Sequence, residues 1–445
     1  MKKVITYGTY DLLHHGHIRL LERAKALGDY LIVGVTADDF DKSRGKINVT
    51  QSLSERIEAV RQTGLADEII VEEYSGQKID DIRKYNIDIF TVGSDWVGQF
   101  DYLNEYCKVV YLDRTTGISS TDLRDSLQGI RLGLIGGGAD VSNILLKYLK
   151  ETKYVNGLVV SGICTEDNDL LTELQDSGVS IYQDYQSLLN HSDAIYVVSK
   201  PEEHFTQIKE ALEASKHVLC ESPIAIRKSE YQTLLKLAKQ KKLILMDAIK
   251  TAYATAYHRL LLLAKTKCVG EIVSVDATCT SLKEYNESNY SWNSITSWGP
   301  TALLPIFQIL GTKYCSKQIV SKFIDEEKNQ DLMTKIDFIY PKAVASIKVG
   351  KGVKSEGELI ITGTKGCIYV PAPWWKTDYF EIHYEHLDDN KKYFYQLDGE
   401  GIRYVLIAFV QAIRTGKGDF FIEEEVSKKI IFMMEDFYSK KYKTI

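Results

Sequence analysis

The segment GTYDLLHHGH, residues 8–17, carries two histidines three residues apart, His14 and His17. A β-branched run that predicts a strand precedes it, and a segment with helical spacing follows it. At a helix N-terminus, free backbone N–H groups and an imidazole can face the same anion. Gly16 lets a phosphate approach the backbone closely. The segment indicates a phosphate-binding turn, although histidines at a helix start can also serve as caps or packing residues.

A second segment of this kind is RTTGISST, residues 114–121. Hydroxyls and backbone amides ahead of a helix, with an arginine before them, also suit a phosphate. Such a run can equally be a simple loop or a helix cap. Because both segments follow strands of one predicted parallel sheet, we expect them at the same edge of that sheet, where ligands bind. Together they predict a triphosphate site.

Residues 1 to about 125 resemble the glycerol-3-phosphate cytidylyltransferase family. The resemblance rests on GTYDLLHHGH, on RTTGISST, where Ser120 replaces a threonine of the family pattern, and on the turn at 93–96. It implies that a phosphomonoester attacks the α-phosphorus of CTP and releases pyrophosphate, with Mg²⁺ on the triphosphate. Such a nucleophile is already anionic at neutral pH, so catalysis reduces to alignment and charge neutralisation.

The resemblance assigns roles to residues of these motifs and of the loop DKSRGKINVT. The implied catalytic residues are His14, His17, Lys46 and Arg114. The implied nucleotide-binding residues are Gly8, Thr9, Tyr10, Asp11, Gly16, Arg44, Asp95, Ser119, Ser120 and Thr121. Asp11 is the candidate partner of Mg²⁺. Lys46 can alternatively be a solvated loop lysine.

A glycine cluster at 136–138 ends the strand-like segment IRLGLIGGG. Gly136 and Gly138 fit the dinucleotide pattern G-x-G-x-x-G, but Val141 stands at its third glycine. The acidic residue expected after the next strand is also displaced, because Thr165 precedes Glu166 there. The cluster alone is a weak indication of a cofactor site.

Residues 130 to about 435 resemble the glucose-fructose oxidoreductase and inositol dehydrogenase (Gfo/Idh/MocA) family. The resemblance is carried by SDAIYVVSKPEEHFTQIKEALEASKHVLCESPIA, residues 192–225, and by later strand segments. It implies NAD(P) as cofactor. The implied cofactor-binding residues are Gly136, Gly138, His204, Glu221 and Pro223.

The same stretch departs from that family at its acid/base positions. Ser222 stands at the lysine of the family motif, and Thr301 stands at its catalytic histidine. Neutral hydroxyls do not supply the proton that carbonyl reduction needs. Lys250, with Tyr253, is a candidate substitute, although Tyr253 can equally be a core residue. The tryptophans at 292, 298, 374 and 375 either line a pocket or belong to the core.

The elements that must position these residues predict an α/β fold. Short β-branched runs at 4–8, 30–35, 68–71, 88–93 and 109–112 alternate with amphipathic segments, which is typical of a parallel sheet covered by helices. We predict three domains. They are a Rossmann-like nucleotidyltransferase domain at 1–128, a Rossmann dinucleotide-binding domain at 129–250, and an α+β antiparallel-sheet domain with closing helices at 251–445.

Composition narrows the classes of protein. The 445 residues carry a net charge of -6 without a long Lys/Arg run, which argues against nucleic acid as a partner. No run of 18 apolar residues predicts a membrane span, and the N-terminal segment does not read as a signal peptide, so we expect a cytoplasmic protein. Seven scattered cysteines without a C-x-x-C pair indicate neither a disulfide framework nor a zinc site. We also expect a homodimer or a higher homo-oligomer.

The leading hypothesis is a bifunctional enzyme that makes a CDP-activated polyol from CTP and a small phosphorylated polyol or ketose, and that reduces a ketose or CDP-ketose with NAD(P)H. The resemblance implies that such a product feeds teichoic acid, capsule or another surface glycopolymer. One alternative keeps the cytidylyltransferase and makes the oxidoreductase-like part a non-catalytic module for binding or dimerisation. Another is an adenylyl-type transferase.

Overall fold

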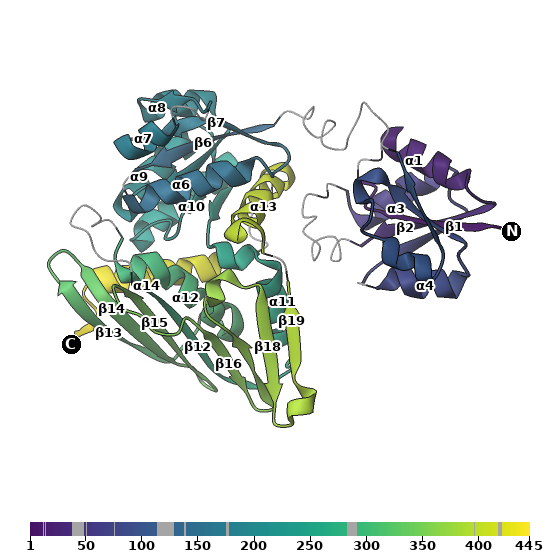
Figure 1. Cartoon of the computed structure of the whole chain (residues 1–445). Coiled ribbons are helices and arrows are strands. Elements are labelled where there is room, and N and C mark those ends of the chain that lie inside the picture. The colour runs from purple at the N-terminus through teal and green to yellow at the C-terminus, as the bar shows by residue number, and fades with distance from the viewer. Residues whose placement is uncertain are drawn as a thin grey trace. The chain divides into compact units, whose positions relative to one another are not determined.

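The computed structural model (Figure 1) describes most of the chain. The described residues are 1–11, 13, 15–37, 49, 51–74, 76–113, 129–137, 139–174, 178–282, 292–395, 397–416 and 421–445. The chain divides into two compact units, Met1–Gly129 and Ile130–Ile445. Each unit is described by itself below.

The first unit is built on a five-stranded parallel sheet in the order β3-β2-β1-β4-β5. All five strands expected from the sequence are confirmed, with bounds that differ by one residue at most. The strands are β1 (Lys3–Gly8), β2 (Tyr30–Thr36), β3 (Glu68–Glu72), β4 (Ile89–Gly93) and β5 (Lys108–Leu112). The helices are α1 (His15–Lys25), α3 (Leu53–Gln62) and α4 (Gln77–Tyr85), with the short η1 (Ser94–Trp96) and η2 (Asp101–Glu105).

Neighbouring residues of β1 serve different cores. Val4 packs with Leu21 of α1 and Val60 of α3, whereas Ile5 packs with Ile82 of α4 and Phe90 on the other face of the sheet. The strand is apolar on both faces because helices cover both, which is typical of a parallel sheet. The strand order reverses between β1 and β4, and at such a point ligands bind beyond the carboxyl ends of the strands.

The second unit begins with a six-stranded parallel sheet in the order β11-β10-β9-β6-β7-β8. Counted along the chain from β6, this is the order 3-2-1-4-5-6 of a dinucleotide-binding fold, with its reversal between β6 and β9. The strands are β6 (Ile130–Gly136), β7 (Leu158–Cys164), β8 (Ile181–Tyr182), β9 (Ala194–Val198), β10 (His217–Cys220) and β11 (Leu245–Asp247). The helices are α6 (Ala139–Thr152), α7 (Asn168–Leu174), α8 (Tyr185–His191), α9 (Pro201–Glu213) and α10 (Lys228–Lys241).

A nine-stranded sheet follows in the order β19-β18-β17-β16-β12-β15-β14-β13-β20. It is mixed, because β12 pairs with β15 and β13 with β20 in parallel, while its other pairs are antiparallel. The strands are β12 (Ile272–Ser281), β13 (Ser316–Asp325), β14 (Gln330–Ile339), β15 (Val344–Lys351), β16 (Leu359–Gly363), β17 (Gly366–Val370), β18 (Tyr379–Tyr384), β19 (Lys391–Phe394) and β20 (Lys443–Thr444).

Helices join this sheet to the Rossmann part of the same unit. The helix α12 (Ser294–Leu310) lies on β12 and β15, α13 (Ile402–Thr415) packs on α6, and α14 (Glu424–Tyr438) contacts both α12 and α10 (Figure 1). The other helical elements are η3 (Lys250–Tyr253), α11 (Thr255–Lys265), η5 (Trp374–Lys376), η6 (Leu387–Asp389) and η7 (Asp398–Gly401). Because α13 and α14 pack on the helices α6 and α10 of the Rossmann part, the predicted boundary at residue 250 stays a prediction.

Candidate active sites

The first candidate site lies at the reversal of strand order in the first unit. The carboxyl end of β1 leads through Thr9, Tyr10 and Asp11 to α1, which begins at His15 and carries Gly16 and His17 in its first turn. The neighbouring strand β4 ends at Gly93 and leads into η1, whose backbone includes Asp95. The two turns therefore meet at one edge of the sheet, and His17 lies at a helix N-terminus, where an anion is favoured.

Gly8 and Tyr10 hold His17 in place. Tyr10 takes a left-handed backbone conformation, with φ of 53°, and its ring is buried. The ring meets the His17 imidazole edge to face, with ring centroids 5.5 Å apart. A Cβ at Gly8 would lie 3.0 Å from two atoms of the Tyr10 ring, so a side chain there would displace it. These two residues therefore support the imidazole, and their predicted contact with the nucleotide stays a prediction.

Asp11 binds the backbone just ahead of α3. Its carboxylate accepts a hydrogen bond from the Gln51 amide at 2.9 Å, and its side chain is buried. No cluster of three or more metal-ligating side chains occurs within the described residues. Mg²⁺ commonly takes one or two carboxylates and completes its shell with substrate phosphates and water, so a lone Asp11 fits a metal that arrives with a triphosphate.

Arg56 is a structural residue of this site that the sequence analysis missed. Its side chain is fully buried, and Nη1 donates to the carbonyl oxygens of Thr9 at 2.6 Å and Thr36 at 2.9 Å, while Nε donates to that of Gln51 at 3.2 Å. It thus ties the ends of β1 and β2 to the start of α3. The available signal was its position four residues before the buried Val60, on the inward face of the helix.

A buried polar network borders the same sheet edge. Tyr7 donates to the carboxylate of Asp81 at 2.8 Å, and Lys78 forms an ion pair with Glu72, which also accepts from a threonine hydroxyl at the end of β2. Burial, followed by the nearby Asp81 charge, raises the pKa of the Tyr7 hydroxyl, which stays protonated at neutral pH. Lys78 and Asp81 escaped notice because α4 reads as a solvent-exposed polar helix.

Several predicted residues of the first site lie outside the described part of the chain. They are His14, Arg44, Lys46, Arg114, Ser119, Ser120 and Thr121. For Asp95 only the backbone is described. The roles assigned to them stay predictions.

The second candidate site is a cavity of about 530 Å³ in the second unit. It lies between α6, the turn after β10, the segment from β11 to η3, α12, the end of β15, and η5. Ser222 and Thr301, predicted from the sequence to stand at acid/base positions, both line it, together with Lys250. Trp292, Trp298 and Trp375 line it too, whereas Trp374 is buried and donates to the Thr278 carbonyl, so three of the four tryptophans face the cavity.

Glu221 and Lys250 form the charged centre of this cavity. The Lys250 ammonium donates to Glu221 Oε1 at 2.9 Å, and the same oxygen accepts from the buried Tyr196 hydroxyl at 2.5 Å. Tyr148 stacks on Tyr196 with centroids 4.0 Å apart, and the Lys250 ammonium lies 5.7 Å from the Tyr148 ring centre. Burial, followed by the Glu221 charge, raises the pKa of Tyr196 well above its usual range, so the hydroxyl remains a donor.

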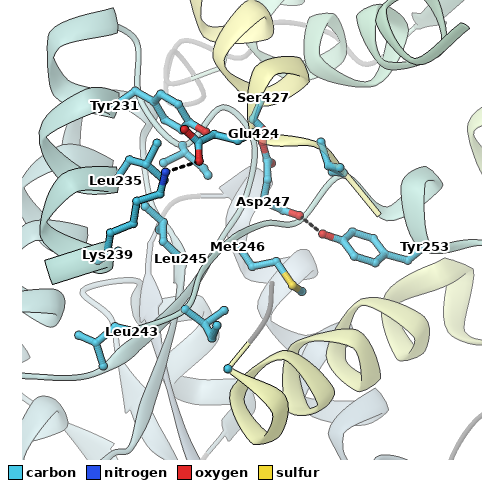
Figure 2. A pocket seen from close by; sticks show the side chains of 15 residues that line it. Tyr231, Leu235, Lys239, Leu243, Leu245, Met246, Asp247, Tyr253, Glu424 and Ser427 are labelled. Carbon is cyan, nitrogen blue, oxygen red and sulfur yellow. Dashed lines mark hydrogen bonds and ion pairs between the residues drawn. The ribbon is translucent and has the colours of Figure 1, made fainter. Parts of the chain in front are cut away.

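The tyrosine expected beside Lys250 was the wrong one. Tyr253 is buried, and its hydroxyl donates to the Asp247 carbonyl at 2.6 Å (Figure 2). It lines a second cavity of about 290 Å³, on the side of α10 and α14, rather than the one that holds Lys250. The short η3 turns Lys250 and Tyr253 in different directions, so the tyrosines that face Lys250 are Tyr148 and Tyr196.

His204 is a support for the turn after β10. It is fully buried, and its ring nitrogens lie 2.8 Å from the Pro223 carbonyl oxygen and 3.0 Å from that of Ser199. Burial lowers the pKa of its imidazole, and the neutral ring, which carries one N–H, donates to one of these two carbonyl oxygens and packs against the other. Neither His204 nor Pro223 lines the cavity; their predicted contact with a cofactor becomes a role in placing Ser222, whose buried hydroxyl has no hydrogen-bond partner within the described residues.

The glycine turn after β6 fits a dinucleotide. Gly136 ends β6 beside the strand-order reversal, and a Cβ at Gly137 would meet only ordinary contacts, with Thr165 Oγ1 at 3.5 Å and Glu166 N at 3.8 Å. The end of β7 thus reaches the glycine turn, where the ribose of a dinucleotide is usually bound. Gly138 lies outside the described residues.

The parallel sheet, with Gly16 and His17 at a helix start beside its strand reversal, is the arrangement of a nucleotidyltransferase. Residues 5–126 match the family described as Cytidylyltransferase-like. The chain is 50% identical over 130 residues to glycerol-3-phosphate cytidylyltransferase of Bacillus spizizenii and 47% identical over 131 residues to that of Staphylococcus aureus. These matches cover 29% of this chain and 100% and 97% of the two relatives. The chain belongs to the cytidylyltransferase family and is an enzyme of that class.

The second unit resembles oxidoreductases. Residues 130–248 match the GFO/IDH/MocA oxidoreductase family with its NAD-binding Rossmann fold. A 3-ketoreductase from Actinomadura kijaniata, solved in complex with NADP, superposes with a TM-score of 0.62 at 18% identity, over 71% of this chain and 99% of the other. At this identity the likeness establishes the fold. Within the described residues, no helix is long and apolar enough to cross a membrane.

Proposed function

We propose that the chain is a bifunctional enzyme. Its first unit joins CTP to a small polyol or sugar phosphate, forming one phosphoanhydride bond at the α-phosphorus and releasing pyrophosphate. Its second unit reduces the carbonyl of a ketose, before or after cytidylylation. The observation that carries the first half is the His17 imidazole, held by Tyr10 at a helix N-terminus beside the strand reversal, in a unit half identical to a glycerol-3-phosphate cytidylyltransferase.

In the transfer step, His17 donates to the α-phosphate, where negative charge grows as the pyrophosphate leaves. The other phosphates of CTP accept hydrogen bonds in the same way from His14, Lys46 and Arg114. Asp11 holds Mg²⁺ together with the triphosphate. The acceptor phosphate needs no base, since it is already ionised, and the Arg56 clamp keeps the turn at Thr9 rigid during the reaction.

In the reduction step, the Gly136–Gly137 turn would hold NAD(P)H, which would supply a hydride to the carbonyl carbon. Lys250 Nζ delivers the proton to the carbonyl oxygen, and the Glu221 carboxylate orients that ammonium from 2.9 Å. Ser222 and Thr301, both on the cavity wall, bind hydroxyl groups of the substrate. The sum is carbonyl plus NAD(P)H plus one proton, giving an alcohol and NAD(P)⁺.

Substitution His17→Ala tests the transferase. We expect pyrophosphate release from CTP and glycerol 3-phosphate to fall by roughly 100-fold or more, as is usual when a transition-state donor is removed. The exposed His386 provides the control His386→Ala, which should retain activity. Full activity of folded His17→Ala would refute the role. A preference for ATP over CTP as the substrate would support the adenylyl-type alternative.

Substitution Lys250→Met tests the reductase. The full chain is incubated with NADPH or NADH and a set of ketoses, ketose phosphates and CDP-ketoses, and absorbance at the nicotinamide band is followed. We expect oxidation with at least one substrate and a fall of roughly 100-fold with Lys250→Met. Because Ser222 and Thr301 replace the usual acid/base pair, the second candidate is a non-catalytic binding module. Absence of oxidation with every substrate, in a chain that still releases pyrophosphate, would favour that module.

A further inference from the structure

The lining of the 530 Å³ cavity is rich in one charge. Four lysines line it, Lys147, Lys250, Lys351 and Lys376, against two glutamates, Glu221 and Glu400, and no other charged side chain is among the described residues that line it. Four positive charges less two negative charges leave an excess of two. Clefts lined by one sign of charge attract ligands of the opposite sign. A neutral ketose needs no such lining.

Two of the lysines converge on a single carboxylate. Glu400 Oε2 lies 2.9 Å from Lys147 Nζ and 3.2 Å from Lys376 Nζ. Lys147 comes from α6 in the Rossmann part, and Lys376 comes from η5 in the sheet part. The exposed fractions of the three side chains are 53%, 41% and 45%, so the cluster faces solvent and the cavity together. An oxygen held between two ammonium groups is the arrangement that a phosphoryl oxygen seeks.

The backbone that presents Glu400 is unusual. Gly399, Glu400 and Gly401 have φ values of 55°, 54° and 88°, so three successive residues are left-handed, and the middle one bears a side chain. Such a conformation costs a non-glycine residue about 1 kcal/mol or more. A strained residue beside a cavity often marks a binding site. Here it brings a carboxylate to the two ammonium groups.

We propose that the substrate of the second unit carries a phosphoryl group, and that Lys147 and Lys376 bind this group where the Glu400 carboxylate lies. The inference rests on the proposed reductase function of this cavity and names the chemical class of its substrate. The phosphoryl group is either the monoester of a ketose phosphate or the diphosphate of a CDP-linked ketose. Glu400 competes with it and is displaced when it binds.

The test is amine-acylation footprinting of the full chain, read at single lysines by mass spectrometry. An acetylating ester is added with ribulose 5-phosphate, CDP-linked ribulose or unphosphorylated ribulose. We expect a phosphorylated ligand to slow acetylation of Lys147 and Lys376 by roughly tenfold, because charge-assisted hydrogen bonds would hold the two ammonium groups, and ribulose to have no effect. If ribulose 5-phosphate protects the two lysines at a lower concentration than CDP-linked ribulose, the site binds a monoester; the reverse order identifies a diphosphate.

Substitutions give effects of opposite sign. Lys147→Gln should weaken the protection of Lys376 by the phosphorylated ligand roughly tenfold, whereas Glu400→Gln should strengthen it by removing the competing anion. Lys239→Gln is the matched control, because Lys239 is another exposed lysine of this unit, paired with Glu424 at 2.5 Å, and does not line this cavity. It should leave the protection unchanged.

The outcomes separate this inference from the reductase proposal. Equal protection by ribulose, protection by NADP⁺ alone, or weaker protection in Glu400→Gln would overturn the inference. Reduction of a neutral ketose without protection of the two lysines would also overturn it while the reductase stands. Protection without nicotinamide oxidation would support the phosphoryl site and refute the reductase. The calorimetric unfolding transition of the second unit, to which Lys147, Lys239 and Glu400 belong, checks that each variant is folded.

Discussion

Arg56 is a guanidinium enclosed in a hydrophobic core, and its three backbone acceptors explain why it is tolerated there. Thr9, Thr36 and Gln51 each present a carbonyl oxygen that no neutral apolar side chain could satisfy. A buried charge of this kind is stabilising only while its hydrogen bonds are complete. The residue therefore couples the turn ahead of His17 to the stability of the whole first unit.

Substitution Arg56→Met should lower the free energy of unfolding of the first unit by about 2–4 kcal/mol, because buried carbonyl oxygens lose their donor. Hydrogen exchange of peptides from residues 1–113, measured against urea, reads this unit alone. Arg61→Met on the same helix is the control, since Arg61 is exposed and pairs only with Glu58 in the described contacts. Equal stability of the two variants would contradict the clamp.

For single residues, the sequence indicated which side chains lie near a site better than it indicated where each side chain points. His17 lies at a helix start, and Ser222, Lys250 and Thr301 line one cavity, while their chemical roles stay predictions. Tyr253 was wrong as the partner of Lys250, because four residues in a tight helical turn point to different sides. The Glu221 contact with Tyr196 joins residues 25 positions apart, and no local pattern records it.

Among the elements, α12 matters most for the second site, because it carries Ser297 and Thr301 to the cavity. Its start is capped twice. The Asn293 side chain accepts from the Thr296 amide at 2.9 Å, and Asp331 of β14 accepts from the Ser294 amide at 2.8 Å. A carboxylate near a helix N-terminus is favourable, but here it is enclosed by the sheet. Burial raises the pKa of Asp331 from 3.8 to about 6.

This shift predicts a pH dependence of stability. The folded chain binds the Asp331 proton more tightly than the unfolded chain, so this contribution to the free energy of unfolding is present at pH 4 and is lost as pH rises to about 6. A pKa difference of about 2 corresponds to about 3 kcal/mol. When Asp331→Asn is unfolded with urea at pH 4, 5 and 6, its free energy of unfolding should not show this decrease. Asp337→Asn, an exposed change on the same strand, should keep it.

The strands of the two parallel sheets were predictable because each is a short, buried, β-branched run between helical segments. Pairing in the nine-stranded sheet was not, since β12 joins β15 in parallel across more than sixty intervening residues. Local alternation shows which face of a strand is buried, but the partner of that strand depends on the path of the chain between them.

At the scale of the whole molecule, the chain holds two units with separate hydrophobic cores. Each contains a parallel sheet whose strand order reverses, and the candidate sites of the two units carry different side chains. The first has Gly16 and His17 at a helix start, and the cavity of the second is lined by Ser222, Lys250 and Thr301. The predicted homo-oligomer stays a prediction.

Separate cores predict two unfolding transitions in differential scanning calorimetry. CTP with Mg²⁺ should raise the midpoint of one transition and NADPH that of the other, each by a stabilisation of about 2.7 kcal/mol at a ligand concentration 100 times its dissociation constant. His17→Ala should reduce only the CTP effect. A single transition shifted by both ligands would contradict this independence.

Trp298 and Trp375 provide the second unit with an intrinsic fluorescent probe. Their rings lie 4.8 Å apart on the wall of the 530 Å³ cavity, and four of the five tryptophans of the chain belong to this unit. Indole emission overlaps the absorption of a reduced nicotinamide. A reduced cofactor bound here would therefore quench tryptophan fluorescence and emit its own fluorescence by energy transfer. Oxidation of that cofactor would restore the indole emission, and each turnover could be watched without a dye.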